Sequence, residues 1–173
     1  MKIVLIGYMG SGKTSVGKQL STALNYKFID LDAQIELSEG MSVSKIFSER
    51  GEIYFRRKEN EIIKNLILSE ENMVLATGGG TPCYGDITNF LASKGNVITI
   101  YLKTTLDILT NRLMLEKNKR PLISHLNNEV SLKDFVRKHL FERSYYYNQA
   151  QLGLDTDRIS VEEIVETIVA KLF

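Results

Sequence analysis

The stretch from residue 7 to residue 14, Gly-Tyr-Met-Gly-Ser-Gly-Lys-Thr, constrains the fold of this chain more than any other feature. It follows the apolar run Ile3-Val4-Leu5-Ile6, which is typical of a parallel strand buried on both faces. It precedes a helical pattern that includes Val16 and Leu20. The stretch matches G-x-x-x-x-G-K-[ST] at every fixed position, in the strand-loop-helix context that this motif requires. The sequence therefore predicts an α/β domain built around a phosphate-binding loop.

The residue types in this loop suit a nucleoside triphosphate. Glycines let the backbone turn so that successive N–H groups converge on phosphate oxygens, helped by the N-terminus of the following helix. Lys13 would place a charge near the β- and γ-phosphates, and the hydroxyl of Thr14 would bind Mg²⁺. The residues expected to bind ATP here are Gly10, Ser11, Gly12, Lys13, Thr14 and Ser15.

Runs rich in β-branched and apolar residues recur along the chain and alternate with helical patterns. The runs expected to form strands are residues 3–6, 27–29, 73–76, 97–102 and, more weakly, 151–154. Strands that alternate with helices predict a mostly parallel, five-stranded sheet covered on both faces. We therefore expect a three-layer α/β sandwich, the P-loop kinase fold, as a single domain over residues 1–173.

Helix starts and interruptions complete this outline. Ser160 with Glu163 predicts a capping box before the last helix, and Thr104 with Asp107 predicts another helix start of the same kind. Residues 33–68 carry helical patterns broken near Gly40 and Gly51 and indicate a helical insertion beside the sheet. Residues 114–128 are polar, charged and interrupted by proline, which predicts a mobile lid.

Composition excludes several classes of function. The 22 basic and 21 acidic residues give a net charge of +1, too balanced for binding a nucleic-acid backbone by counterion release. The single cysteine, Cys83, permits no internal disulfide. The apolar run near the N-terminus is too short for a signal peptide or a membrane span. We therefore expect a cytoplasmic monomer with no nucleic-acid or membrane partner.

Polar residues at strand ends are candidates for the rest of the site, because ligands of open parallel sheets bind outside the carboxyl ends of the strands. Asp30 and Asp32 follow the second run, and could serve Mg²⁺ and a substrate hydroxyl, or could simply cap a turn with Asp32 as the helix N-cap. The triple glycine 78–80 ends the third run and is either a close approach to a ligand or a flexible turn. Arg56 could bind a carboxylate or lie in solvent.

Six features in this order resemble the shikimate kinase family over nearly the full chain. They are the phosphate loop, Asp30-Leu31-Asp32, Phe55-Arg56-Arg57-Lys58-Glu59, Gly78-Gly79-Gly80, Arg120-Pro121-Leu122 and Arg143-Ser144-Tyr145-Tyr146-Tyr147. The resemblance implies transfer of the γ-phosphoryl of ATP to the 3-hydroxyl of shikimate, a step of aromatic amino acid biosynthesis. It also implies that residues 33–62 form the substrate-binding insertion.

The resemblance further implies roles for individual residues. Asp32 would take the proton of the attacking hydroxyl and act as a catalytic residue together with Lys13 and Arg120, and Asp30 would lie near Mg²⁺. Arg56 and Arg143 would bind the carboxylate of shikimate. The other residues implied to contact ligands are Gly78, Gly79 and Gly80 at the substrate, Glu59 behind Arg56, Phe47 and Phe55 against the ring, and Arg112 on adenine, with Arg120 reaching ATP from the lid.

Two rival functions share the same motif. Another small-molecule kinase, such as a gluconate or nucleoside monophosphate kinase, would use the same core with a different acceptor. A non-catalytic nucleotide switch would bind ATP and ADP without shikimate-dependent ADP release. Two arginines and a carboxylate that faces a hydroxyl suit a polyhydroxylated acid better than a dianionic phosphate.

Overall fold

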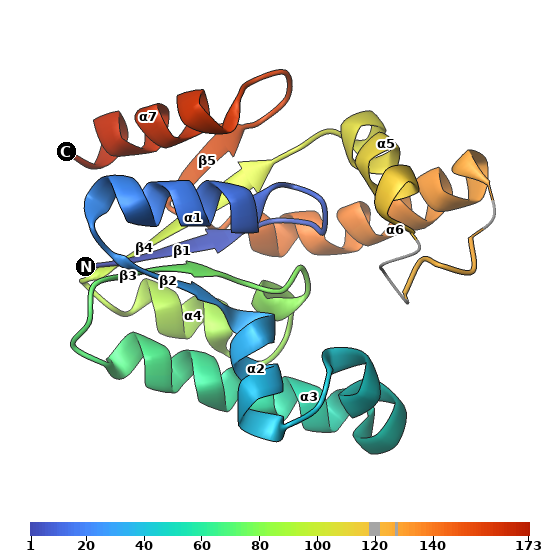
Figure 1. Ribbon diagram of the computed structural model, residues 1–173, viewed down its shortest axis with the longest axis horizontal. Coiled ribbons are helices and arrows are strands. Elements are labelled where there is room, and N and C mark those ends of the chain that lie inside the picture. The colour runs from blue at the N-terminus through green and yellow to red at the C-terminus, as the bar shows by residue number, and fades with distance from the viewer. Residues whose placement is uncertain (118–121, 127) are drawn as a thin grey trace.

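The five predicted strands form one parallel sheet in this computed structural model, which describes residues 1–117, 122–126 and 128–173 (Figure 1). The strands are β1 (Lys2–Ile6), β2 (Lys27–Asp30), β3 (Met73–Ala76), β4 (Val97–Lys103) and β5 (Leu152–Asp155). Their order across the sheet is β2-β3-β1-β4-β5, and every neighbouring pair is parallel. This confirms the predicted sheet and puts all the carboxyl ends on one edge.

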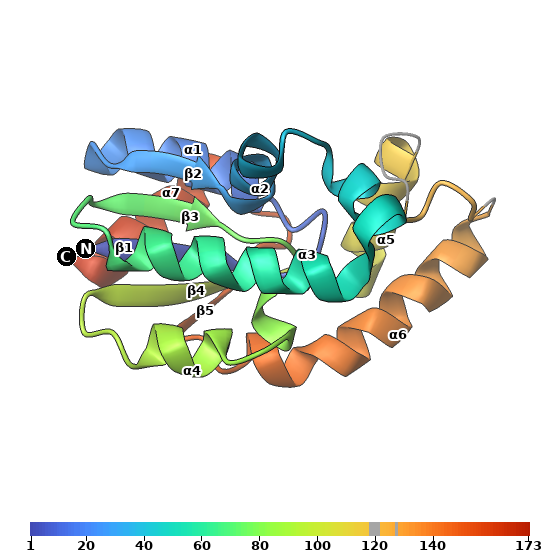
Figure 2. The same ribbon diagram turned by 90° about the horizontal axis from the view of Figure 1, so that it is seen from below.

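Helices cover both faces of this sheet. They are α1 (Lys13–Leu24), α2 (Leu31–Glu39), α3 (Val43–Leu68), α4 (Ile87–Ala92), α5 (Leu106–Glu116), α6 (Glu129–Tyr147) and α7 (Val161–Leu172), with a short 3₁₀ helix η1 (Thr81–Cys83). Helices α1 and α7 lie on one face, and α3, α4 and the end of α6 lie on the other (Figures 1 and 2). The three-layer α/β architecture is therefore confirmed.

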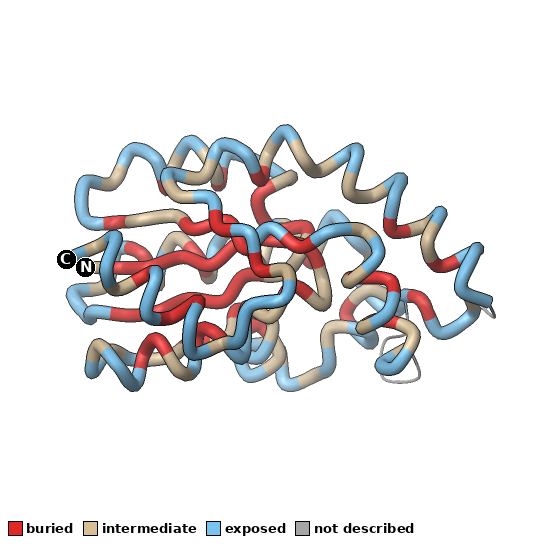
Figure 3. Tube along the Cα trace, turned by 90° about the horizontal axis from the view of Figure 1, so that it is seen from above, coloured by how far each residue is buried: buried red, intermediate tan, exposed pale blue. Residues whose placement is uncertain are grey.

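The central strands are buried along their whole length, as their continuous apolar runs predict. In β1 and β3 every residue is buried, and the buried stretches of the chain trace follow the sheet (Figure 3). One apolar cluster joins the sheet to α1 and α7, and a second joins it to α3, α4 and α6. The sheet is thus fixed between two cores, which leaves the loops at its carboxyl edge free to form a site.

The breaks expected in the helical insertion lie where the sequence places them. Gly40 ends α2 in the left-handed conformation, with φ 65°. Gly51 interrupts α3 with φ 80° and ψ 169°, so that the helix is kinked there. The predicted capping box of Ser160 and Glu163 is also confirmed at the start of α7.

The helix start predicted at Thr104 is wrong. Helix α5 begins at Leu106 after Thr105, and the N–H of Thr105 donates to Asp157 Oδ1 at 3.0 Å. Thr104 is buried, and its hydroxyl shares a 2.7 Å hydrogen bond with Thr156. A threonine that joins two strand ends through its hydroxyl has the same local sequence as one that caps a helix, so spacing alone did not distinguish them.

Within the described ranges, no helix combines the length and the apolar character of a membrane-spanning segment.

Candidate active site

The phosphate loop joins β1 to α1 and has a backbone that its glycines permit. Gly10 and Gly12 have φ of 83° and 92°, in the left-handed region that favours glycine. Gly12 is the N-cap of α1 and offers no side chain to the first N–H groups of the helix. These N–H groups therefore remain for an anionic ligand at the start of the helix.

The lysine of the loop is held by main-chain oxygens. Lys13 Nζ donates to the carbonyls of Gly7 and Tyr8, each at 2.8 Å, and its residue is only 9% exposed. The ammonium group is therefore fixed by the loop itself. Ser11 is also buried, and its hydroxyl is a buried side-chain oxygen with no hydrogen-bond partner in the described part of the chain. A Cβ on Gly7 would lie 2.9 Å from that hydroxyl, so the side chain of Ser11 lies against the backbone of the loop itself.

Thr14 and Asp30 bring two oxygen ligands together beside the loop. Thr14 Oγ1 donates to Asp30 Oδ2 at 3.0 Å, and Asp30 Oδ1 accepts from the N–H of Ala33 at 3.3 Å. Asp30 is thus the N-cap of α2, a role that the alternative reading of this pair gave to Asp32. A hydroxyl and a carboxylate at the head of a phosphate loop are the donors that Mg²⁺ prefers, so these residues fit the ion.

A cavity of about 430 Å³ lies between the loop and the carboxyl edge of the sheet. Its walls include the start of α1 from Gly12 to Ser15, both aspartates of the 30–32 segment, and Gly78 with Gly79. Arg112 also lines it, and Arg112 Nη1 donates to the carbonyl of Gly10 at 3.0 Å. The predicted base and the predicted nucleotide residues other than Ser11 and Arg120 therefore face one space, of a size usual for small-molecule sites.

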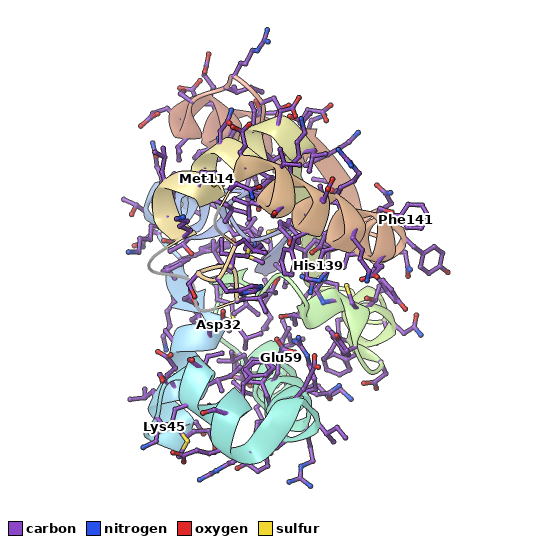
Figure 4. The ribbon with its side chains drawn as sticks, turned by 90° about the vertical axis from the view of Figure 1, so that its right-hand side faces the viewer. Asp32, Lys45, Glu59, Met114, His139 and Phe141 are labelled. Atoms are coloured by element: carbon purple, nitrogen blue, oxygen red, sulfur yellow. The ribbon has the colours of Figure 1, made fainter. Side chains whose placement is uncertain are left out.

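Asp32 is the carboxylate with the most altered proton affinity near this cavity. The pKa of Asp32 is raised to about 6, chiefly by burial and also by the neighbouring carboxylates of Asp30 and Glu59, while Lys13 and Arg56 partly oppose the rise. A carboxylate with a raised pKa accepts a proton more readily than an ordinary one while it is still ionised at neutral pH. In Figure 4, Asp32 and Glu59 lie between α2 and α3 on one side and α5 and α6 on the other.

The predicted contact between Glu59 and Arg56 is present in α3. Arg56 Nη1 donates to Glu59 Oε2 at 2.9 Å, and Glu59 is 2% exposed. The guanidinium also contacts Glu52 Oε1 at 3.4 Å and lies 4.0 Å from the centroid of the Tyr84 ring. Arg56 is therefore oriented by two carboxylates and by stacking on an aromatic ring.

The triple glycine brings both predicted arginines to the same turn. A Cβ on Gly80 would lie 2.7 Å from Arg56 Nη2, and a Cβ on Gly79 would lie 3.5 Å from Arg143 Nη1. A Cβ on Gly79 would also lie 3.3 Å from the main-chain nitrogen of Met9 in the phosphate loop. Arg56 and the phosphate loop therefore approach the backbone of this turn closely, and Arg143 lies in ordinary contact with it.

The predicted aromatic wall is also assembled. The rings of Phe47 and Phe55 have centroids 4.5 Å apart, with Phe55 buried. The guanidinium of Arg56 lies 5.1 Å from the Phe55 ring. Arg120, predicted to reach ATP from the lid, lies outside the described residues, as does Pro121.

Two residues of this region, Thr81 and Tyr84, were missed from the sequence, and a third, Tyr147, belongs to the segment that carries the resemblance but had no role assigned to it. Thr81 Oγ1 donates to Glu59 Oε1 at 2.6 Å, Tyr147 donates a hydrogen bond to the carbonyl of Gly79, and Tyr84 stacks on Arg56. Thr81 and Tyr84 directly follow the triple glycine, which is the one signal that could have pointed to them. Tyr147 lies four residues after Arg143, a helical spacing that puts both on one face.

Comparisons with known proteins agree on one family. The family model described as shikimate kinase matches residues 9–173. A shikimate kinase from Flavobacterium psychrophilum is 48% identical over 172 residues, which cover 99% of each chain.

Solved structures are similar over the same length. A shikimate kinase from Bacteroides thetaiotaomicron matches with a TM-score of 0.90 and 36% identity, over 99% of this chain and 98% of that one. One from Acinetobacter baumannii, in complex with shikimate, matches with a TM-score of 0.86 and 32% identity, over 99% and 92%. With its phosphate loop, its acidic pair and its arginine-lined turn in the order described above, the chain belongs to the shikimate kinase family.

Proposed function

We propose that this chain transfers the γ-phosphoryl group of ATP to the 3-hydroxyl of shikimate, giving ADP and shikimate 3-phosphate. Membership of the shikimate kinase family supports use of a nucleotide and of a small-molecule acceptor. The proposal specifies ATP as the donor, Mg²⁺ as the metal and shikimate as the acceptor. The phosphate loop supports ATP, and the Thr14–Asp30 pair supports Mg²⁺.

One observation carries the proposal: Asp32 lies between the phosphate loop and the turn that both arginines approach. It lines the same cavity as Lys13 and Thr14. Its Oδ1 is also 3.1 Å from the Cβ position of Gly78, the first glycine of the turn. An acid bound by Arg56 and Arg143 would therefore present a ring hydroxyl to Asp32 on the side that faces the transferred phosphoryl group.

Each residue then has a chemical task. Asp32 accepts the proton of the attacking hydroxyl as the oxygen–phosphorus bond forms. Lys13, held by two carbonyls of the loop, neutralises charge on the phosphate oxygens, and Mg²⁺ at Thr14 and Asp30 would supply further positive charge. Arg56 and Arg143 orient the acid, so most of the rate enhancement comes from positioning and from neutralised charge.

The proposal extends to the insertion, the lid, the contacts with adenine and with the shikimate ring, and the state of the enzyme in the cell. Residues 33–62 act as the substrate-binding insertion, and residues 114–128 act as a lid that excludes water, with Arg120 reaching ATP on closure. Arg112 packs on adenine, and Phe47 with Phe55 contacts the shikimate ring. The enzyme works as a cytoplasmic monomer without nucleic-acid or membrane partners.

A coupled ADP-release assay tests the function directly. Purified protein with ATP and Mg²⁺ is expected to release ADP rapidly only when shikimate is added, and phosphorus NMR is expected to identify shikimate 3-phosphate. Gluconate and nucleoside monophosphates serve as competing acceptors. If the enzyme preferred either of these acceptors, that compound would take the place of shikimate as the proposed substrate. Tight nucleotide binding with no acceptor-dependent ADP release would favour the nucleotide switch.

A further inference from the structure

The threonine that follows the triple glycine completes the support of a buried carboxylate. Thr81 Oγ1 donates to Glu59 Oε1 at 2.6 Å, and the other oxygen, Oε2, accepts from Arg56 Nη1 at 2.9 Å. Thr81 is 1% exposed and Glu59 2% exposed. Both oxygens of the Glu59 carboxylate are therefore occupied by donors, one from each side, within the interior of the protein.

The two hydrogen bonds to the Glu59 carboxylate help to fix the direction of the Arg56 guanidinium. Arg56 has a second carboxylate within reach, because its Nε and Nη2 lie 3.4 Å from Glu52 Oε1. The side chain of Glu52 is 51% exposed, whereas that of Glu59 is 3% exposed. A carboxylate fixed on its far side by a short hydrogen bond keeps its near oxygen in one place. Thr81 therefore stabilises the contact between Arg56 and the buried Glu59.

Thr81 also lies beside the proposed base. A Cβ on Gly78 would lie 3.1 Å from Asp32 Oδ1, 3.1 Å from Thr81 Oγ1 and 3.3 Å from Glu59 Oε1. The two carboxylates thus approach one glycine, and the hydroxyl of Thr81 is the neutral group among them. Its hydroxyl donates a hydrogen bond to Glu59 Oε1, while Glu59 Oε2 accepts from Arg56.

We propose that Thr81 is a positioning residue for the acid-binding arginine: through Glu59 it sets the orientation of Arg56 and thereby the affinity for an anionic acceptor. This inference rests on the proposed function, because the anion is taken to be the carboxylate of shikimate. Thr81 does not contact the substrate in this scheme. Removal of its hydroxyl should therefore change the KM for the acid and leave the handling of ATP intact.

The test compares two substitutions that differ in the hydroxyl. Thr81→Val keeps the branched shape and removes the donor, and is expected to raise the KM for shikimate about tenfold. The KM for ATP and kcat should stay within about twofold of the wild type. Thr81→Ser keeps the donor and should restore the wild-type KM. Wild-type turnover of shikimate, measured first, tests the proposed function separately from these variants.

Two further measurements distinguish positioning from general structural damage. In an Arg56→Ala background, Thr81→Val should add little to the shikimate KM, since its effect passes through Arg56. The wild-type preference for shikimate over its uncharged methyl ester should shrink in Thr81→Val. If valine prevents folding, Thr81→Ala takes its place in the same comparisons.

Three results would overturn the inference. The first is an unchanged shikimate KM in a folded variant that lacks the hydroxyl. The second is equal impairment by serine and valine. The third is a rise in the KM for ATP as large as that for shikimate.

Discussion

The two halves of the site are built in different ways. The phosphate loop is one continuous segment of eight residues, and its cation is held by two main-chain carbonyls of the same segment. The other half, which we propose binds the acid and call the acid-binding half, gathers Asp32, Arg56, the triple glycine and Arg143 from four separate parts of the chain. There the contacts run between side chains, as from Thr81 through Glu59 to Arg56.

This difference predicts different responses to mutation. A loop fixed by its own backbone should keep its shape when distant side chains change. A pocket fixed by successive side-chain contacts should lose its geometry when any one of them is removed or displaced. Substitutions in the acid-binding half should therefore alter the use of shikimate and leave nucleotide binding nearly unchanged.

The largest effect is expected at Asp32, where the two halves meet. Asp32→Asn keeps the shape of the side chain and removes the proton acceptor, so kcat should fall about a thousandfold. The affinity for a fluorescent ADP analogue should stay within about threefold, because the loop is intact. Steady-state rates and nucleotide titration measure the two quantities. A kcat close to that of the wild type would remove the catalytic role of Asp32.

The pH profile tests the same residue without a mutation. Burial raises the pKa of Asp32 to about 6, so the ionised form that accepts a proton is lost as the pH falls below that value. The acid limb of kcat/KM for shikimate should therefore fall about tenfold for each pH unit below about 6 and be level above about 7. Product formation followed by NMR avoids coupling enzymes. A level profile down to pH 5, or an unchanged limb in the residual activity of Asp32→Asn, would contradict this assignment.

A matched pair of arginines separates the halves more directly. Arg143→Ala should raise the KM for shikimate about tenfold, through loss of a charge-assisted hydrogen bond, and leave the KM for ATP unchanged. Arg112→Ala should do the reverse, because Arg112 lines the cavity beside Gly10. Steady-state kinetics with each substrate varied in turn measures both constants. If either variant changed both constants equally, the two halves would not be independent.

The fold could be predicted from the sequence because its signals are local. Each strand is a short apolar run, and each break in the insertion is a glycine that adopts a left-handed conformation, as at Gly40. The capping box at Ser160 was found for the same reason. The prediction failed at Thr104, where the partner of the hydroxyl is Thr156, 52 residues away. No local pattern contains such a pairing.

The residues of the site also divide into those that a local motif predicts and those whose contacts depend on distant segments. The loop residues and Asp32 could be predicted from motifs, and the structure places Asp32 and all of these loop residues except Ser11 around one cavity. The support of Arg56 could be predicted only in part: Glu59 follows at helical spacing, whereas Thr81 lies 22 residues from Glu59 and Tyr84 comes from the same later segment. Burial of Asp32, which raises its pKa, also depends on distant elements. Contacts between remote side chains are the part that the sequence does not encode locally.

The smallest effect is expected from a single methyl group at the turn. In Gly80→Ala the new Cβ would stand 2.7 Å from Arg56 Nη2, so the flexible guanidinium must move while the backbone can stay. The KM for shikimate should rise about threefold to fivefold, with the KM for ATP and the thermal midpoint nearly unchanged. Gly153→Ala is the matched control, since a Cβ there meets nothing within 4 Å among the described residues. An equal effect of both alanines, or a rise in the KM for ATP after Gly80→Ala, would show that the turn does not act through Arg56.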